Sequence, residues 1–370
     1  MEELLLFVLF VLCTGSFFYM LVCTDSNSKT PMGWIRRIIY TKGPHLIKQQ
    51  ISQCRKIFGK KFYEKLHNLY QYIFYTNNPI GQILYILIFW SAFGVYYKYG
   101  IFKHFGNTPY VNHIHTACGA FIFIFCNYIF YRTCTVSPGV ITSENCEDVK
   151  KRYEEYYDEV LYKSNQTCQT CKIIKPARSK HCRVCDKCIS RFDHHCIWVR
   201  QCIGQNNYKY FVIFLFSHIF LCCYGVLVGI LCLYGIAVKL QLFKLTYKNS
   251  VTGEIHKATA FRVFSYIIDK EPVFVFVIFV CLIFSITLIA FFLYHLNMIK
   301  NDKTTNERIR KNDFQRAYLT EMQALTEYLK THQNDEAKKR LGQLKQCWKS
   351  LNNGKYQGLV LGLKKIFSYM

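Results

Sequence analysis

The stretch that decides the fold is Tyr210–Val238, YFVIFLFSHIFLCCYGVLVGILCLYGIAV, which holds no Asp, Glu, Lys or Arg. A bilayer core about 30 Å thick needs roughly 20 apolar residues in a helix. Runs of this length are too long for strands and too uniform for amphipathic surface helices. Four other uncharged runs meet or approach the same length: Leu4–Cys23, Ile80–Tyr97, Ile114–Tyr131 and Val273–Ile299.

These runs point to a polytopic, all-α membrane protein. The alternative is a soluble protein with buried core helices. Five such runs in 370 residues would leave too little polar chain to cover them. A channel or transporter would need polar or charged groups inside the spans, and only Asn127 and a few histidines such as His218 and His295 are found there. We interpret both histidines as packing residues.

The charge balance is strongly basic, because 47 Lys and Arg against 23 Asp and Glu give a net charge of +24. In a soluble protein this charge would suggest binding to nucleic acid. Because membrane spans are predicted, we expect the basic residues to face anionic lipid headgroups, and we expect no nucleic-acid partner. If residues 24–79, 132–209 and 297–370 are cytosolic, they hold 39 of the 47 basic residues. The density per residue is nearly even, so the positive-inside signal supports this topology only weakly.

The first run could be a cleaved signal peptide or a permanent anchor. It follows Met1-Glu2-Glu3, and no Lys or Arg precedes Lys29. Positive charges that come after the run favour an anchor with a lumenal N-terminus. The only glycosylation sequon, Asn165-Gln166-Thr167, is then expected to carry no glycan.

The C-terminal region is expected to be partly helical. Its apolar residues recur every three or four positions from Phe314 to Leu329, with Lys and Arg between them. Two alternatives remain open for this helix: packing on its own domain, or lying on the membrane surface.

Residues 168–202 carry seven cysteines and three histidines, with repeated two-residue gaps between cysteines. Such C-x2-C turns present two sulfurs to one ion and are typical of zinc sites. Ten donors exceed by two the eight that two tetrahedral zinc ions need. One Cys and one His would be spare, and counting leaves open which. The run Asp193-His194-His195-Cys196 offers a carboxylate, a base and a thiol together. The alternative is a purely structural zinc module on a membrane tether.

This array resembles the cysteine-rich domain of the DHHC protein S-acyltransferases. The resemblance rests on Cys168-x2-Cys171-x9-His181-Cys182-x2-Cys185-x2-Cys188-x4-Asp193-His194-His195-Cys196-x5-Cys202-x4-Asn207-x3-Phe211, together with Lys175-Pro176-Ala177-Arg178-Ser179-Lys180. Ser137-Pro138-Gly139 and Thr304-Thr305-Asn306-Glu307 are similar to the family's Asp-Pro-Gly and Thr-Thr-x-Glu elements. The resemblance runs from about Ile80 to Arg308.

The sequence departs from the family at several points. Ile197 stands where Pro is usual, Arg200-Gln201 replaces Asn-Asn, and Ser137 replaces Asp. None of these removes a ligand or a catalytic residue type. Near the end, Gly362 stands roughly where the family's tail element has Asn, so substrate handling or tail docking is expected to differ.

The resemblance implies a four-span core, to which the first run adds an N-terminal span, and a cytosolic cysteine-rich domain with two structural zinc ions. The implied domains are 1–79 (anchor and basic loop), 80–131 (spans two and three), 132–209 (cysteine-rich domain), 210–299 (spans four and five with a lumenal loop at 239–272) and 300–370 (basic cytosolic tail). One zinc would be held by Cys168, Cys171, His181 and Cys188, and the other by Cys182, Cys185, His195 and Cys202.

The resemblance also implies a palmitoyltransferase. Cys196 would be the nucleophile, His194 its base and Asp193 the orienting acid, with Thr305 in contact with Asp193. The implied co-substrate is a long-chain acyl-CoA such as palmitoyl-CoA, and the implied partners are client proteins with membrane-proximal cysteines. We expect Lys175, Arg178 and Lys180 to bind CoA phosphates, with a solvated basic loop as the alternative. The family suggests the endoplasmic reticulum or Golgi, with the active site and C-terminus cytosolic.

Overall fold

The structure is a computed structural model that describes residues 59–352 except 63, 66, 74, 105–107, 159–160, 249–252 and 333. The predicted first span and the tail element near Gly362 lie outside the described residues. The chain divides into two compact units. The first contains Gln82–Arg132 and Val212–Tyr294, and the second contains His67–Gly81, Thr133–Phe211 and the chain from His295 onward.

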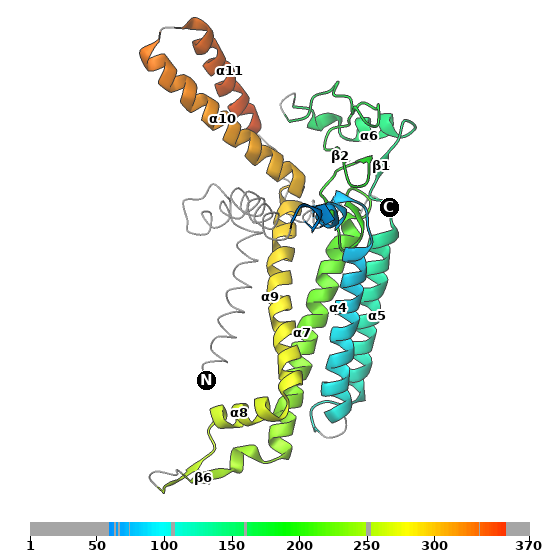
Figure 1. The fold of residues 1–370 in the computed structure, drawn as a ribbon, viewed down its shortest axis with the longest axis vertical. Helices are drawn as coiled ribbons and strands as arrows, with labels where there is room; N and C mark the ends of the chain where they lie inside the picture. Colours follow the sequence, from blue (N-terminus) through cyan, green and yellow to red (C-terminus); the bar gives the residue numbers. More distant parts are fainter. Residues whose placement is uncertain are drawn as a thin grey trace. The chain divides into compact units, whose positions relative to one another are not determined.

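Four helices in the described residues are long and apolar enough to cross a membrane. Helix α4 (Ile80–Tyr96) continues into a π-helical turn, η2 (Tyr97–Phe102), and is followed by α5 (His113–Thr135), α7 (Tyr208–Lys239) and α9 (Pro272–Lys300). These four helices run side by side in Figure 1. They confirm the four predicted spans from Ile80 onward, with ends that differ by a few residues from the uncharged runs.

Close packing and paired polar groups hold the helices of the first unit together. A Cβ on Gly100 would lie 2.1 Å from the Phe274 ring, so only glycine allows η2 to approach α9 this closely. Each ring nitrogen of His218 has a hydrogen-bond partner: the Tyr85 hydroxyl lies 2.7 Å from Nε2, and the Phe214 carbonyl oxygen lies 2.7 Å from Nδ1. Its buried ring is therefore satisfied within the bundle, as the packing interpretation predicted.

The segment between α7 and α9 has secondary structure that was not predicted from the sequence. It holds η4 (Leu242–Lys244), a hairpin of β6 (Thr246–Lys248) and β7 (Ile255–Lys257), and the amphipathic helix α8 (Ala260–Lys270). Val263 and Ile267 on α8 are buried in a cluster with Ala237 and Leu242. The Thr259 hydroxyl caps α8 by accepting from the Arg262 N–H.

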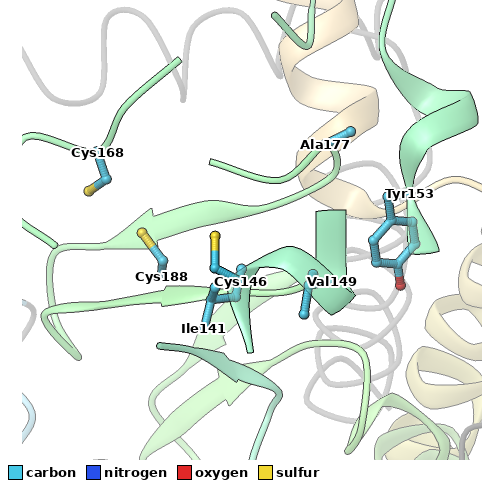
Figure 2. Close-up of a cluster of buried hydrophobic side chains, with 7 residues drawn as sticks. All are labelled: Ile141, Cys146, Val149, Tyr153, Cys168, Ala177 and Cys188. Atoms are coloured by element: carbon cyan, nitrogen blue, oxygen red, sulfur yellow. The ribbon is translucent and has the colours of Figure 1, made fainter. Parts of the chain in front are cut away.

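The cysteine-rich region of the second unit consists of very short strands. Strands β1 (Val140–Ile141), β3 (Lys187–Ile189) and β2 (Lys180–Cys182) form one antiparallel sheet, and β4 (His194–Cys196) pairs with β5 (Gln201–Ile203) in another. Helix α6 (Cys146–Arg152) and the turn η3 (Glu154–Tyr156) precede β2. Figure 2 shows the core between α6 and the first sheet, which is small and includes two cysteines of the zinc array. Bound metal ions would add stability to a core this small.

The last described part of the second unit is a helical hairpin of α10 (Thr305–Thr331) and α11 (Asp335–Asn352). The two helices contact each other, and Arg340 on α11 lies 2.8 Å from Glu321 on α10. Helix α10 confirms the predicted helical periodicity. Its buried Tyr318 belongs to the predicted apolar stripe.

Candidate active site and metal centres

The eight donors that the family resemblance assigned to zinc form two groups in the structure. Within each group all ligand atoms lie within 4.8 Å of one another, one group being Cys168, Cys171, His181 and Cys188, and the other Cys182, Cys185, His195 and Cys202. Strand pairing brings them together: His181 faces Cys188 across β2 and β3, and His195 faces Cys202 across β4 and β5. Figure 2 shows the sulfurs of Cys168 and Cys188 on the same side of the small core.

The distances fit tetrahedral zinc. Zn–S and Zn–N bonds of about 2.3 and 2.0 Å place neighbouring ligand atoms about 3.5–3.8 Å apart. The His181 Nδ1 lies 3.3 Å from the Cys171 sulfur and 3.9 Å from that of Cys188. Each group is closed by four protein ligands, which is the arrangement of structural zinc sites. The Nε2 of His181 lies 3.3 Å from the Asp186 carboxylate, and such partners fix the orientation of a ligand ring.

Strand β4 separates the candidate zinc ligands from the remaining Cys and His. Side chains alternate along a strand, so His194 and Cys196 share one face and His195 points to the other. On its own face, the His195 Nδ1 lies 3.4–3.8 Å from three sulfurs, those of Cys185, Cys202 and Cys182. The alternation therefore identifies Cys196 and His194 as the spare pair that the donor count left open.

Asp193, His194 and Cys196 form a hydrogen-bonded chain. The Nδ1 of His194 lies 2.7 Å from Oδ2 of Asp193, and the imidazole also hydrogen-bonds to the Cys196 thiol. Asp193 and Cys196 are buried, whereas 28% of the His194 side chain is exposed. A buried carboxylate, an imidazole and a thiol in this order have the geometry of a nucleophile, its base and the acid that orients the base.

The charges of the three groups support one another. Burial opposes the ionised forms of all three, but the mutual hydrogen bonds and charges outweigh it. They lower the pKa of Asp193 to about 2 and raise the pKa of His194 to about 10. Despite burial, the His194 imidazole and the backbone N–H groups of Val199 and Trp198 lower the pKa of Cys196. The arrangement therefore favours a thiolate beside an imidazolium, and the thiolate is the nucleophilic form.

Asp193 is also held from the start of α10. The Thr305 backbone N–H donates to Oδ1 of Asp193 at 2.8 Å, while the Thr305 hydroxyl is buried without a partner. The contact implied by the family resemblance is thus present, but the main chain makes it. Thr304 and Glu307 form a capping box, with each side chain accepting from the other's backbone N–H.

The Ser137-Pro138-Gly139 element supports β5 and the turn after it. Gly139 has a φ of +93°, and its carbonyl accepts from the Ser190 N–H at 2.8 Å. A Cβ on Gly204 would lie 2.5 Å from the Pro138 carbonyl oxygen, so the close approach requires glycine there. The Asn207 side chain closes the turn, accepting from the Gly204 N–H and donating to the Cys202 carbonyl.

The three basic residues that were expected to bind phosphate differ in their surroundings. Arg178 has no exposed side-chain area, and its guanidinium binds Asp302 and Glu307. It is therefore not available to a phosphate. Lys175 and Lys180 both line a cavity of about 310 Å³. The rest of the cavity wall comes from Tyr162, Lys163, Gln166, Pro176, Ala177, Ser179 and Arg310.

This cavity is strongly electropositive. Three lysines and one arginine line it, and its described lining includes no acidic residue. Burial and the positive charge of Arg310 lower the pKa of Lys180. The Lys180 ammonium also donates to the Asn306 side chain at 2.9 Å, which ties the cavity wall to α10.

Several residues around this site were not predicted from the sequence. Arg191 and Asp302 form a buried ion pair at 3.0 Å. His295, which is almost fully buried, lies 2.9 Å from the Tyr208 hydroxyl, and its ring is near that of His194. The pattern Thr-x-x-Glu at 304–307 is a recognisable helix-start signal, so the capping box could have been found from the sequence. No comparable signal marks Arg191, Asp302 or His295.

Comparisons with known proteins agree with this geometry. The family model described as DHHC palmitoyltransferase matches residues 161–312, which contain both donor groups, the Asp193–Cys196 run and the α10 start. Residues 161–312 of this chain therefore match a DHHC palmitoyltransferase domain. Palmitoyltransferase ZDHHC4 of Rattus norvegicus is 28% identical over 258 residues, covering 70% of this chain and 74% of the relative.

Two further relatives extend the comparison. Palmitoyltransferase ZDHHC4 of Bos taurus is 28% identical over 316 residues, covering 83% of this chain and 84% of the relative. Palmitoyltransferase SWF1 of Saccharomyces cerevisiae is 50% identical over 90 residues, covering 24% of this chain and 27% of the relative. The likeness to ZDHHC4 therefore extends well beyond the cysteine-rich domain.

Proposed function

We propose that this protein is a protein S-acyltransferase that moves a long-chain acyl group, such as palmitoyl, from acyl-CoA to cysteine thiols of client proteins through an acyl-Cys196 intermediate. The match of residues 161–312 to the DHHC palmitoyltransferase model and the likeness to curated palmitoyltransferases support protein S-palmitoyltransferase activity. The observation that carries the mechanism is the hydrogen-bonded chain of Asp193, His194 and Cys196, which includes the one His and one Cys of the array outside the two donor groups.

The first step forms the acyl-enzyme. The Cys196 thiolate attacks the thioester carbonyl of acyl-CoA, and the new S–C bond forms as the bond to the CoA sulfur breaks. The imidazolium of His194 gives its proton to the departing CoA thiolate. Asp193 keeps the His194 ring in the required tautomer and stabilises its charged form.

The second step transfers the acyl group to the client. Neutral His194 takes the proton of a client cysteine, whose thiolate attacks the acyl-Cys196 carbonyl. Cys196 leaves as a thiolate beside the imidazolium, which is the state that began the cycle. One thioester is exchanged for another in each step, so no ATP is required.

The two ends of acyl-CoA need different environments. Burying the acyl chain away from water contributes about 0.8 kcal/mol per CH₂, which favours the apolar membrane helices. The phosphates of CoA fit the cavity lined by Lys163, Lys175, Lys180 and Arg310, because charge-assisted hydrogen bonds are the strongest contacts to phosphate. The two zinc ions, when bound, hold the strands in place and supply no catalytic group.

We also propose that the active site and the C-terminus are cytosolic and that the N-terminus is lumenal, in the endoplasmic reticulum or Golgi. Acyl-CoA and zinc–thiolate clusters both belong to a reducing compartment. Asn165 is an exposed sequon residue in the cysteine-rich domain. Expression in cells followed by glycosidase treatment tests the orientation, and a glycan on Asn165 would contradict it.

The decisive experiment uses the purified full-length protein in nanodiscs with palmitoyl-CoA. We expect intact-protein mass spectrometry to detect one hydroxylamine-labile acyl adduct, which Cys196→Ser abolishes while two zinc ions per chain remain. Cys146→Ser is the matched control, because Cys146 is a buried thiol of the same unit that belongs to neither donor group. The competing hypothesis, a structural zinc module, predicts no adduct on the unchanged protein.

A further inference from the structure

We propose that Arg178 is a positioning residue for acyl transfer, which fixes the start of α10 and through it the carboxylate of Asp193. The proposal rests on the proposed function, because Asp193 matters only if Cys196 and His194 perform the reaction. It assigns Arg178 a role different from that of Lys175 and Lys180, its neighbours in the same basic stretch.

The Arg178 guanidinium is saturated by one short segment of chain. Its Nε and Nη2 donate to the two carboxylate oxygens of Glu307 at 2.6 and 2.9 Å, a bidentate pair. Its Nη1 lies 3.1 and 3.2 Å from the carboxylate oxygens of Asp302, and Nη2 donates to the Asp302 carbonyl at 2.8 Å. The Tyr156 ring covers it at 4.5 Å. One side chain thus binds both ends of the segment 302–307.

This segment is the junction between α9 and α10. Asp302 has a left-handed backbone with a φ of +45°, in the turn that follows α9. Glu307 has a second task there, since its side chain accepts from the Thr304 N–H at 2.8 Å in the capping box. Arg178 therefore binds both the turn after α9 and the first turn of α10.

The first turn of α10 carries the contact to the catalytic chain. The Thr305 N–H donates to Oδ1 of Asp193 at 2.8 Å, and Oδ2 of the same carboxylate lies 2.7 Å from the His194 ring. Because the main chain makes this contact, its geometry depends on where α10 starts. If the helix start moved, no side-chain rotation at Thr305 could restore the hydrogen bond. The positive end of the helix dipole also faces the Asp193 carboxylate.

The chemistry at position 178 requires arginine. Only a planar guanidinium can serve two carboxylates and a carbonyl at once, whereas lysine offers a single point charge. A helix start displaced by a fraction of an ångström would turn the Asp193 carboxylate away from His194. Misplacement of a reacting group by about 1 Å costs on the order of 100-fold in rate.

The first test separates this role from phosphate binding. Arg178→Lys and Lys175→Met are compared in nanodiscs by single-turnover formation of the hydroxylamine-labile adduct across palmitoyl-CoA concentrations. We expect Arg178→Lys to lower the maximal rate constant about 10- to 100-fold, with two zinc ions retained and less than a threefold change in the half-saturating concentration. Lys175→Met is expected to raise that concentration and leave the maximal rate constant unchanged. Arg178→Lys behaving like Lys175→Met would overturn the proposal.

The second test removes the link itself while Arg178 stays in place. Thr305→Pro deletes the N–H that donates to Asp193, at the first helical position, where proline is tolerated. The preceding residue, Thr304, already has the extended backbone that proline demands, with φ −102° and ψ 161°. The matched control is Thr305→Ala, which keeps the N–H and removes only the unpartnered hydroxyl.

The two Thr305 variants separate the main-chain link from the hydroxyl. We expect Thr305→Pro to reproduce the rate defect of Arg178→Lys, and Thr305→Ala, which keeps the main-chain link, to lose less of the rate than Thr305→Pro. In the double variant Arg178→Lys/Thr305→Pro the two losses of rate should not multiply, because both substitutions break the same connection to Asp193. A normal acylation rate in Thr305→Pro, or losses of rate that multiply in the double variant, would overturn the proposal even if Arg178→Lys loses zinc. If the protein without any substitution forms no acyl adduct, the proposed function itself is refuted.

Discussion

The two faces of β4 carry adjacent histidines with different environments. His195 faces three cysteine sulfurs at 3.4–3.8 Å, where a zinc ion fits. His194, one position earlier, faces the Asp193 carboxylate at 2.7 Å and the Cys196 thiol. The residue type is the same, so the role comes from the strand periodicity and from what each face meets. A strand of three residues thus places the proposed metal-binding face and the proposed acid–base face on opposite sides.

Among the substitutions that test the difference between the two faces of β4, His195→Ala is expected to have the largest effect. A structural zinc site contributes its binding energy directly to folding, about 10–16 kcal/mol in small zinc domains. We expect zinc content to fall from two to one or fewer per chain and the cysteine-rich domain to lose its cooperative unfolding transition. Zinc analysis and protease sensitivity would measure this. A folded variant that still binds two zinc ions would contradict the assignment of this face.

His194→Ala is the matched substitution on the other face. It removes the base but leaves all eight donors, so we expect two zinc ions and a normal unfolding transition. General acid–base groups typically contribute about 10²- to 10⁴-fold, and acyl-enzyme formation should slow by that amount. Single-turnover mass spectrometry would measure the rate. Loss of zinc in His194→Ala would show that the two faces are not independent.

Gly204→Ala should disturb both faces moderately. Its new Cβ would lie 2.5 Å from the Pro138 carbonyl oxygen and 2.6 Å from the Ile189 side chain. Overpacking of this kind costs about 1–3 kcal/mol, and here it displaces the turn that follows β5, the partner of β4. We expect easier zinc release to a chelator together with slower acylation. An effect on only one of the two measurements would show that β5 does not support both faces.

How well the sequence predicted a feature depended on how far apart along the chain the interacting residues lie. The spans were predictable because a bilayer requires uncharged runs such as Tyr210–Val238. Ligand spacing revealed the zinc array because each C-x2-C pair is local. Arg178 was predicted to bind phosphate because its stretch is basic, whereas its partners Asp302 and Glu307 lie 124 and 129 residues away. No local pattern encodes such a pairing. The three-residue strands were likewise too short to show a period.

The smallest expected effect lies outside β4, at the electropositive cavity, and tests whether binding and catalysis are separable. Lys163 lines this cavity, whereas the exposed Lys172 of the same region does not. An exposed charge contributes about 0.2–1 kcal/mol, so Lys163→Met should raise the half-saturating palmitoyl-CoA concentration about two- to fivefold. The increase should shrink at high salt, because screening weakens the contact in the unchanged protein.

Lys172→Met is the control and should leave the half-saturating concentration unchanged. The maximal acylation rate should stay the same in both variants, since neither lysine contacts the Asp193–His194–Cys196 chain. A fall in that rate for Lys163→Met would mean that the cavity also sets the geometry of β4.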